Sequence, residues 1–458
     1  MMAQSAGALD GASIRLAEFI SAARYDALPD HVVHAVKRAL LDYVSCAVAG
    51  SAMPVSKALM AYFQEEDASR HAAVVGSAIR LSAPNAAMVN GANTHGLDFD
   101  DGYTQGSAHP AGAVFPAVLA MAERHGASPR DIVVAAAVGY DVMLRIAATV
   151  HPSTARRGYH NTAIAGVFGA AAGAASILGL NAAQALDALG LAGSFAGGIR
   201  EYLAEGAEIK RLHPGKAARD GIVCAELAKR GISGPSRVLE GSLGFFNVIG
   251  NGDIRPDRLL GDLGAAYAVA DIYFKPYPCC RHYHAAIDGI RQLRAEHAFA
   301  AADVERVDIG LYSVGAMGHD HRHCDTLLEA QMSAPCAAAM AILDGDVAAP
   351  MFMPDKLARP ELATLMLRIH TNVDDECERI YPRIRSGAAT VVLRDQRSLS
   401  VRVLEPKGES ANPMTDADLE HKFLANCQPL VGPARARQLL DLVWNFDSAA
   451  DAAPLYHW

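Results

Sequence analysis

The first half of the chain has hydrophobic residues at the spacing typical of helices. Apolar side chains recur every three or four residues over 31–48, so a helix is predicted there, with Asp30 as its N-cap. A second helix is predicted to begin at Ser128, which is followed by proline and, three positions on, by an aspartate. Further helices are expected from Asn181 and over 215–231, and no strand pattern of similar strength interrupts this region.

The periodicity changes after about residue 268. Apolar and polar residues alternate over 307–311, as in a half-buried strand. Residues 390–394 and 398–403 flank a short polar turn and are predicted to form a hairpin. Helical stretches over 333–343 and 360–369 lie between these strands, which indicates an α+β unit.

The end of the chain is helical again, because Thr415 with Asp418 three residues later is a capping pattern. A length of 458 residues exceeds what one hydrophobic core usually supports. We therefore predict a mainly α protein with two domains. Residues 1–267 and 406–458 form a large all-helical domain, and 268–405 form a smaller α+β lid domain.

Charge and cysteine usage narrow the function classes. The net charge of -9 argues against a nucleic-acid partner, although one basic pocket for a small anion remains compatible with it. The eight cysteines are scattered and the N-terminus lacks a signal-peptide pattern, so a cytoplasmic protein with reduced thiols is expected. The uncharged stretch 160–186 is rich in alanine and glycine, and we expect a buried core helix there rather than a membrane span.

Four clusters concentrate histidine, lysine, arginine and aspartate beside glycine or proline, at predicted helix boundaries or in loops. Their composition favours acid–base chemistry on a carboxylate-bearing substrate, with cations holding carboxylates and histidines moving protons. Each cluster taken alone also fits a structural role, such as a solvated loop, a helix cap or surface charge. The clusters span 95–110, 156–160, 210–215 and 275–284.

Metal and nucleotide chemistry lack their usual sequence patterns. The run from His319 to Asp325 is dense in ligand types, but no distant ligand pair with zinc spacing accompanies it. The chain has no glycine-rich dinucleotide motif after a strand, no Walker loop and no nucleophile elbow. We therefore expect no functional metal and no cofactor.

The clusters, read in order, resemble the MmgE/PrpD family over nearly the whole chain. That family contains 2-methylcitrate dehydratase, cis-aconitate decarboxylase and iminodisuccinate epimerase. The resemblance implies a homodimer of a helical domain plus an α+β lid, without a cofactor. The matching stretches are LLDYVSCAVAG (40–50), NGANTHGLDFDD (90–101), HPAGAVFPA (109–117), GYHNTAIAGVFGAAAGAA (158–175), KRLHPGKAARDG (210–221), FKPYPCCRHYHAAID (274–288) and NPMTDADLEHKF (412–423).

The resemblance also implies which residues form the site. Three positions depart from the common pattern: Gly102 where a hydroxyl residue is frequent, Lys216 where an aromatic or small residue is frequent, and Gln331 where a lysine is common. These departures bear on the identity of the substrate. The implied catalytic residues are Asp98, His109, His160, Lys210, Lys275 and His284, and the implied substrate-binding residues are Arg156, Arg157, Tyr159 and His213.

The expected activity is that of a cofactor-independent lyase of the 2-methylcitrate dehydratase type, acting on a small di- or tricarboxylate. An epimerase or a decarboxylase on a similar acid is the alternative, because each of the three reactions passes through or near a carbanion beside a carboxylate. A non-catalytic carboxylate-binding protein is the rival from another class. It would predict an incomplete acid–base set, whereas every implied histidine and lysine is present. No nucleic-acid or membrane partner is expected.

Overall fold

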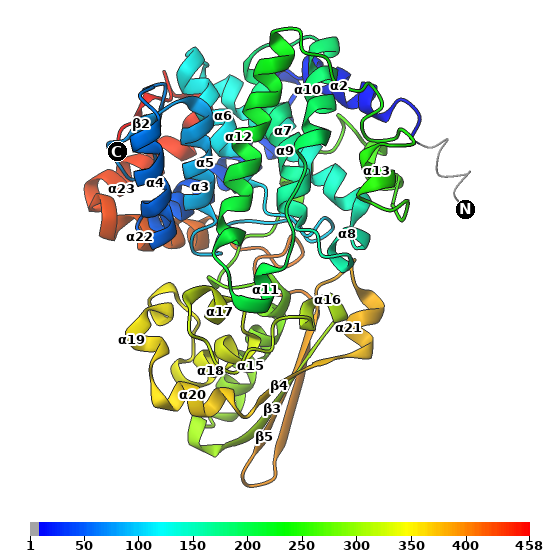
Figure 1. Cartoon of the computed structure of the whole chain (residues 1–458). Coiled ribbons are helices and arrows are strands. Elements are labelled where there is room, and N and C mark those ends of the chain that lie inside the picture. The colour runs from blue at the N-terminus through cyan, green and yellow to red at the C-terminus, as the bar shows by residue number, and fades with distance from the viewer. Residues whose placement is uncertain (1–8) are drawn as a thin grey trace.

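The structure is a computed structural model that describes residues 9–458 (Figure 1). It is mainly helical, which confirms the predicted fold class. The larger domain, in the upper part of Figure 1, contains the long helices. These are α2 (Ala12–Ala22), α3 (Asp30–Ser51), α4 (Pro54–Glu66), α5 (Ala83–Thr94), α6 (Ala111–His125), α7 (Pro129–Val150), α9 (Asn161–Ile177), α10 (Ala182–Phe195) and α12 (Ile209–Lys229), with the short α8 (Ser153–Arg156), α11 (Tyr202–Glu205), α13 (Phe245–Val248) and α14 (Asp257–Leu260).

Helices α5, α7, α9 and α12 form the centre of this domain, where small residues allow close packing. A Cβ atom on Gly91 of α5 would lie 2.5 Å from the Cα atom of Gly215 in α12. A Cβ atom on Gly215 would lie 2.1 Å from the carbonyl oxygen of Met88. Only glycine fits at these two positions, and their contact fixes α12 against α5, the helices that lead to two of the sequence clusters.

Helix α7 is long and apolar enough to cross a membrane by length and composition, and its apolar stretch is entirely buried inside the protein. The bent pair α3–α4 passes the same criterion only if it is counted as one span. The uncharged stretch 160–186 consists of α9, which is buried over most of its length, and the start of α10. The prediction of a buried core helix there is confirmed.

The lid contains a four-stranded sheet with the strand order β4-β3-β5-β6. Strands β3 (Val304–Leu311) and β4 (Ile369–Val373) are parallel, whereas β3 is antiparallel to β5 (Gly387–Leu393), and β5 to β6 (Ser398–Val403). Residues alternate between buried and half-buried along β5, which packs against the long lid helix. The lid helices are α15 (His284–His297), α16 (Ser313–Ala316), α17 (Leu327–Gln331), α18 (Ala334–Asp344), α19 (Pro354–Leu357), α20 (Pro360–Met366) and α21 (Asp375–Ile380).

The chain returns to the larger domain after the lid. Helices α22 (Asp416–Val431) and α23 (Pro433–Trp444), orange-red in Figure 1, lie beside the blue helix α3. The Nζ atom of Lys422 in α22 lies 2.7 Å from Oδ1 of Asp42 in α3, and both side chains are buried. Phe274 belongs to the core of the helical domain, and Tyr277 is the first residue of the lid core.

Three of the predicted helix starts carry side-chain caps. Ser128, Asn181 and Thr415 each form a capping box with the residue three positions on, so these three predicted helix starts are confirmed. Asp30 is the first residue of α3 rather than its cap, because Pro29 occupies the N-cap position without a side-chain hydrogen bond.

Three other details of the predicted elements were wrong. Helix α12 begins at Ile209, six residues before the predicted start, and continues through Pro214. The helix predicted over 360–369 ends at Met366, and Ile369 begins strand β4. The helical domain also contains a two-residue antiparallel ladder between β1 (Ala72–Ala73) and β2 (Arg80–Leu81).

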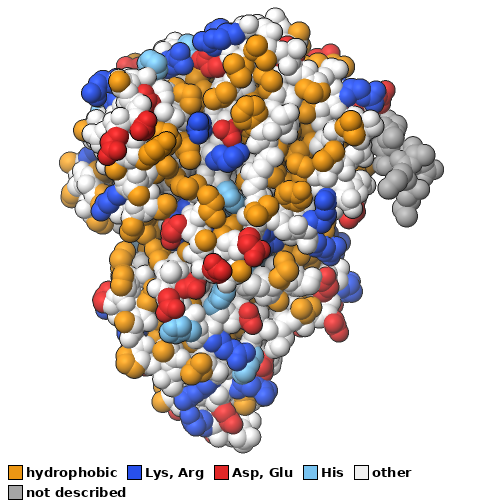
Figure 2. Space-filling model, in the orientation of Figure 1, with side chains coloured by type: hydrophobic (Ala, Val, Ile, Leu, Met, Phe, Trp, Pro, Cys, Tyr) orange, Lys and Arg blue, Asp and Glu red, His pale blue; other side chains and the backbone are white. Residues whose placement is uncertain are grey.

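On the face shown in Figure 2, aspartate and glutamate side chains gather across the middle of the molecule, and lysine and arginine are more frequent toward its two ends. Hydrophobic side chains are scattered among them. Histidine side chains are visible on both the helical domain and the lid in the same view. Positive charge is also concentrated inside the protein, in the cavity described next.

Candidate functional site

A cavity lies between the helical domain and the lid, and both domains supply its walls. Five of the six residues implied to be catalytic line it, together with Tyr159. The sixth, His284, lies behind its wall. The lining residues are Asp98, Ser107, His109, Ala155, Tyr159, His160, Asn161, Arg200, Tyr202, Leu203, Lys210, Tyr273, Lys275, Cys280, Arg281, His282, His319, Met332 and Arg385.

Asp98 lies between two buried lysines. Its Oδ1 atom is 2.5 Å from Nζ of Lys210 and 3.0 Å from Nζ of Lys275. Lys275 also donates to the backbone oxygen of Asp98 at 2.8 Å. Asp98 has a backbone φ of 50°, a left-handed conformation that is uncommon for residues other than glycine. The turn after α5 thus presents one carboxylate to two ammonium groups from distant segments.

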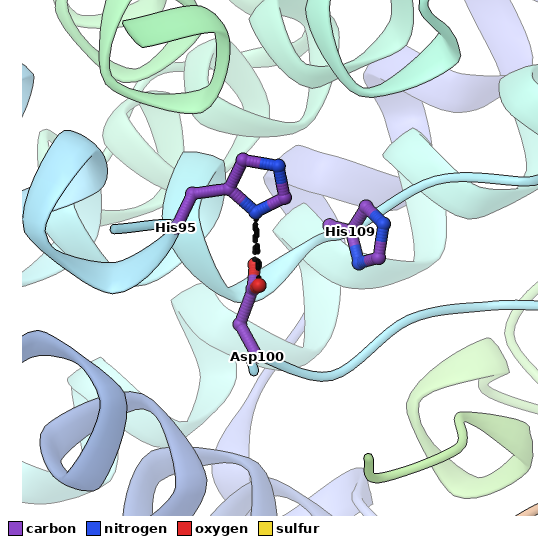
Figure 3. A group of neighbouring side chains, drawn as sticks. All are labelled: His95, Asp100 and His109. Atoms are coloured by element: carbon purple, nitrogen blue, oxygen red, sulfur yellow. Dashed lines mark hydrogen bonds and ion pairs between the residues drawn. The ribbon is translucent and has the colours of Figure 1, made fainter. Parts of the chain in front are cut away.

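His95 connects Lys210 to a second carboxylate, that of Asp100, and Figure 3 shows the His95–Asp100 part of this contact. Its Nδ1 atom lies 2.9 Å and 3.0 Å from the two carboxylate oxygens of Asp100, and its Nε2 atom lies 3.0 Å from Nζ of Lys210. Because a lysine ammonium only donates, Nε2 accepts and Nδ1 carries the proton that bonds to Asp100. His95 is fully buried, and its Nε2 atom lies only 3.8 Å from Oδ1 of Asp98, so the two side chains hold the Lys210 ammonium together.

The side chains of His95, Asp100 and His109 could in principle hold a metal ion, since their ligand-type atoms lie within 4.8 Å of one another (Figure 3). Two of those atoms already share a hydrogen bond, because Nδ1 of His95 donates to Asp100. The ammonium group of Lys210 lies 3.0 Å from the other nitrogen of His95 and would repel a dication. The donor set therefore fits a hydrogen-bond network better than a metal centre.

His109 and His160 in the cavity each have one ring nitrogen engaged. Nδ1 of His109 lies 2.6 Å from the backbone oxygen of Asp101, so Nδ1 donates and Nε2 is left unprotonated in the neutral ring. Nδ1 of His160 lies 2.9 Å from Nδ1 of His213, a buried side chain behind it. His213 thus contacts His160 rather than lining the cavity itself.

Burial and neighbouring cations control the protonation of these groups. Burial, followed by the Lys275 ammonium, holds the pKa of His109 well below its usual range. Burial, followed by His213 and Lys210, does the same to the pKa of His160. Both imidazoles are therefore neutral near pH 7 and can accept a proton.

The three charged groups at the centre respond differently to burial. Burial opposes ionisation of Asp98, but Lys210 and Lys275 outweigh it and hold the pKa of the carboxyl well below its usual range. At Lys275 burial lowers the pKa, but Asp98 together with Tyr273 and Asp100 outweighs burial, so the pKa is raised. At Lys210 burial dominates and lowers the pKa. Lys210 is thus the more readily deprotonated of the two amines.

The arginines of the cavity are not the predicted ones. Arg200, Arg281 and Arg385 line it. By contrast, the side chain of Arg156 is 52% exposed, with its Nη2 atom 3.6 Å from Glu378. Arg157 donates to the backbone oxygen of Ile249 at the surface. The proposed substrate-binding role of these two residues has no support from their positions.

His284 also differs from its predicted place. It is fully buried, with Nδ1 3.0 Å from Nη1 of Arg281 and Nε2 3.2 Å from the backbone oxygen of Cys279. It therefore contacts a cavity-lining arginine from behind. Arg281 is held on another side by Glu409, whose Oε1 atom lies 3.0 Å from its Nη2 atom.

Other cavity residues lay within or near sequence clusters but were not singled out. His282 and Cys280 occur in the same cluster as Lys275, and His319 begins the histidine-rich loop that was considered for metal binding. Nδ1 of His282 lies 2.6 Å from the hydroxyl oxygen of Tyr312. The proximity of Cys280 and His282 to Lys275 was the available signal in the sequence. Spacing alone does not tell which side chains of such a run face the cavity.

Two of the departures from the family pattern have structural explanations. A Cβ atom on Gly102 would lie 2.3 Å from the hydroxyl oxygen of Tyr273, so the tyrosine side chain occupies the space of a larger residue. Lys216 lies at the surface of α12, where it pairs with Asp220 at 2.8 Å. Gln331 lies at the domain interface and is described below.

A helical domain and an α+β lid that enclose a cation-rich cavity with neutral histidines define an enzyme site. Family comparison agrees: the MmgE/PrpD N-terminal domain matches residues 14–257, and the MmgE/PrpD C-terminal domain matches residues 277–447. The chain therefore belongs to the MmgE/PrpD family and is an enzyme of that group.

Characterised relatives cover nearly the whole chain. The chain is 28% identical over 441 residues to cis-aconitate decarboxylase of Homo sapiens, covering 93% of this chain and 90% of the relative. It is 26% identical over 481 residues to cis-aconitate decarboxylase of Aspergillus terreus, covering 99% and 97%. The corresponding enzyme of Mus musculus is 26% identical over 445 residues, covering 93% and 89%.

Proposed function

We propose that this protein is a cofactor-independent lyase that acts on a small di- or tricarboxylate through a carbanion-like intermediate. One observation carries the proposal: a single cavity brings four histidines, the neutral His109 and His160 among them, next to two buried lysines and three arginines. Guanidinium and ammonium groups bind carboxylates, and the neutral imidazoles can remove a proton from the adjacent carbon.

The electrostatics of the cavity suit the difficult step of such a reaction. Loss of a proton or of carbon dioxide beside a carboxylate places negative charge on that group as an enediolate-like species. Lys275, whose pKa is raised, remains an ammonium and stabilises this charge. Lys210, whose pKa is lowered, can donate a proton to a leaving group or to carbon. Closure of the lid on the helical domain excludes water from these charges.

Dehydration and decarboxylation use these groups differently. In dehydration a neutral histidine removes the carbon-bound proton and an ammonium protonates the departing hydroxyl, which fits the protonation states of His109, His160 and Lys210. In decarboxylation carbon dioxide leaves first and an acid protonates the carbanion. The names of the relatives favour this second reaction. Epimerisation would need two groups on opposite faces of one carbon.

The test is a screen of citrate, methylcitrate, cis-aconitate and iminodisuccinate in deuterium oxide, followed by NMR. Deuterium incorporation reports a carbanion whichever product forms, and the products distinguish dehydration, decarboxylation and epimerisation. We expect exchange or turnover with at least one of these acids. If pure protein binds none of them and exchanges no proton in any, the lyase proposal is wrong for this substrate class.

A further inference from the structure

Gln331 joins the lid to the segments that carry the central charged groups. It is the last residue of α17 and is fully buried. Its Nε2 atom donates to the backbone oxygen of Leu97 at 2.6 Å and to that of Pro278 at 3.0 Å. Its Oε1 atom accepts from Nη2 of Arg211 at 3.0 Å. One side-chain amide therefore bonds to three segments. Leu97 precedes Asp98, Arg211 follows Lys210, and Pro278 lies three positions after Lys275.

Arg211 completes a clamp on the turn before Asp98. Its Nη1 atom donates to the backbone oxygen of Gly96, so consecutive carbonyls of the turn, at Gly96 and Leu97, are held by Arg211 and Gln331. A residue in a sparsely populated backbone region persists only where its surroundings hold it there. Asp98, with its φ of 50°, follows directly after these two carbonyls.

The backbone of Gln331 extends the clamp to the far wall of the cavity. Its carbonyl oxygen accepts from the amide of Cys280 at 2.9 Å and from the hydroxyl of Tyr283 at 2.5 Å. Cys280 lines the cavity, and Lys275 lies in the same loop. Gln331 thus sets the distance between the loop of Lys275 and the turn of Asp98.

We infer that Gln331 is a positioning residue of the proposed lyase, which aligns Asp98 with Lys210 and Lys275 when the lid is closed. The inference rests on the proposed function. Glutamine suits the position because the site demands two donors and one acceptor at once. A glutamate would offer no donor to the two carbonyls, and a lysine would offer no acceptor and would place an ammonium against the guanidinium of Arg211.

The test compares Gln331→Met, Gln331→Glu and the milder Gln331→Asn with wild type. We expect kcat to fall on the order of ten- to a hundredfold, the scale of a misplaced catalytic group, while KM changes less than about threefold. Asp98 raises the pKa of both lysines, so a looser turn should lower their pKa and move the high-pH limb of the kcat profile to lower pH. Hydrogen exchange of amides 96–100 should become at least about tenfold faster.

Leu362→Ala is the matched control, because Leu362 is buried in the lid core. It should lower the melting temperature but leave the kcat pH profile and the exchange of amides 96–100 unchanged. If the Gln331 variants lose only melting temperature, as the control does, the inference is wrong; if Gln331→Met does not fold, Gln331→Asn decides. The exchange measurement needs no substrate. If the wild-type protein is inactive on all the acids, the proposed function is refuted, and unchanged exchange of amides 96–100 in the Gln331 variants would separately refute the positioning role.

Discussion

The change Asp98→Asn isolates the charge at the centre of the site. Asparagine tolerates a left-handed backbone about as well as aspartate, so the φ of 50° does not add strain. The amide has nearly the shape of the carboxylate but no charge. Two ammonium groups, at 2.5 Å and 3.0 Å from Oδ1, would then lie buried with their shared counter-ion removed.

The size of the effect follows from burial. Removing one partner of a buried ion pair costs about 3–5 kcal/mol, because the other charge is left uncompensated. An unfolding entropy of roughly 2.1 cal/mol/K per residue gives about 1 kcal/mol/K for a chain of 458 residues that unfolds as one unit. We therefore expect the melting temperature at pH 7 to fall by about 3–5 °C.

The variant should also reverse the pH dependence of stability that Lys275 imparts and strengthen that of Lys210, whose pKa is already lowered in wild type. Without Asp98, burial lowers the pKa of Lys210 and Lys275 below the unfolded value of about 10.4. The folded state then binds fewer protons than the unfolded state between the two values, so stability rises with pH up to about 10.4, by at most about 1.4 kcal/mol per pH unit for each lysine. In wild type the raised pKa of Lys275 stabilises the folded protein at neutral pH. This stabilisation is lost only as the pH rises above the unfolded value of about 10.4.

The measurement is thermal and urea unfolding of wild type and variant from pH 7 to pH 10. Asp346→Asn is the control, because that carboxylate is half exposed and lies 3.6 Å from an arginine. The control should match wild type within about 0.5 kcal/mol at every pH. An Asp98→Asn protein as stable as wild type at pH 7, or one whose deficit does not shrink toward pH 10, would refute the reasoning.

Further predictions concern activity. His160→Ala should lower turnover at least about a hundredfold with little change in melting temperature, whereas alanine at the exposed His323 should leave turnover unchanged; equal activity in both would contradict a role in proton transfer. Glu409→Gln should raise KM several-fold, because the carboxylate 3.0 Å from Arg281 is lost, and an unchanged KM would count against carboxylate binding by that arginine. The low-pH limb of turnover should lie below about pH 6.5, since burial lowers the pKa of His109 and His160 and the base is lost only below that lowered value; a limb above pH 7 opposes this. Dialysis against EDTA should leave activity intact, and restoration of lost activity by one divalent ion would overturn the expectation.

Elements with local signals could be predicted from the sequence. The capping boxes at Ser128 and Thr415 involve residues three positions apart, and the hairpin of β5 and β6 follows from alternation around a turn. The start of α12 could not be predicted this way. Lys210 to Pro214 have no apolar periodicity, and their helical conformation depends on the packing of Gly215 against α5.

The same distinction applies to the site. Asp98, His160 and Lys210 lie within short motifs, and these motifs converge on one cavity as expected. Their catalytic roles stay predictions. The arginines of the cavity could not be predicted from a motif. Arg156 lies near His160 in sequence yet is exposed to solvent, whereas Arg385, near the end of the lid segment, lines the cavity. Only the three-dimensional arrangement separates these two cases.

The return of the chain to the helical domain has a consequence for its synthesis. A ribosome releases residues in order, so the lid core, which ends at Leu393, is complete before α22 emerges. Until then the face of α3 that α22 covers, with Asp42 awaiting Lys422, stays uncovered on the nascent chain. A premature stop before the end of α22 would leave that face of α3 exposed, a target for chaperones and for aggregation.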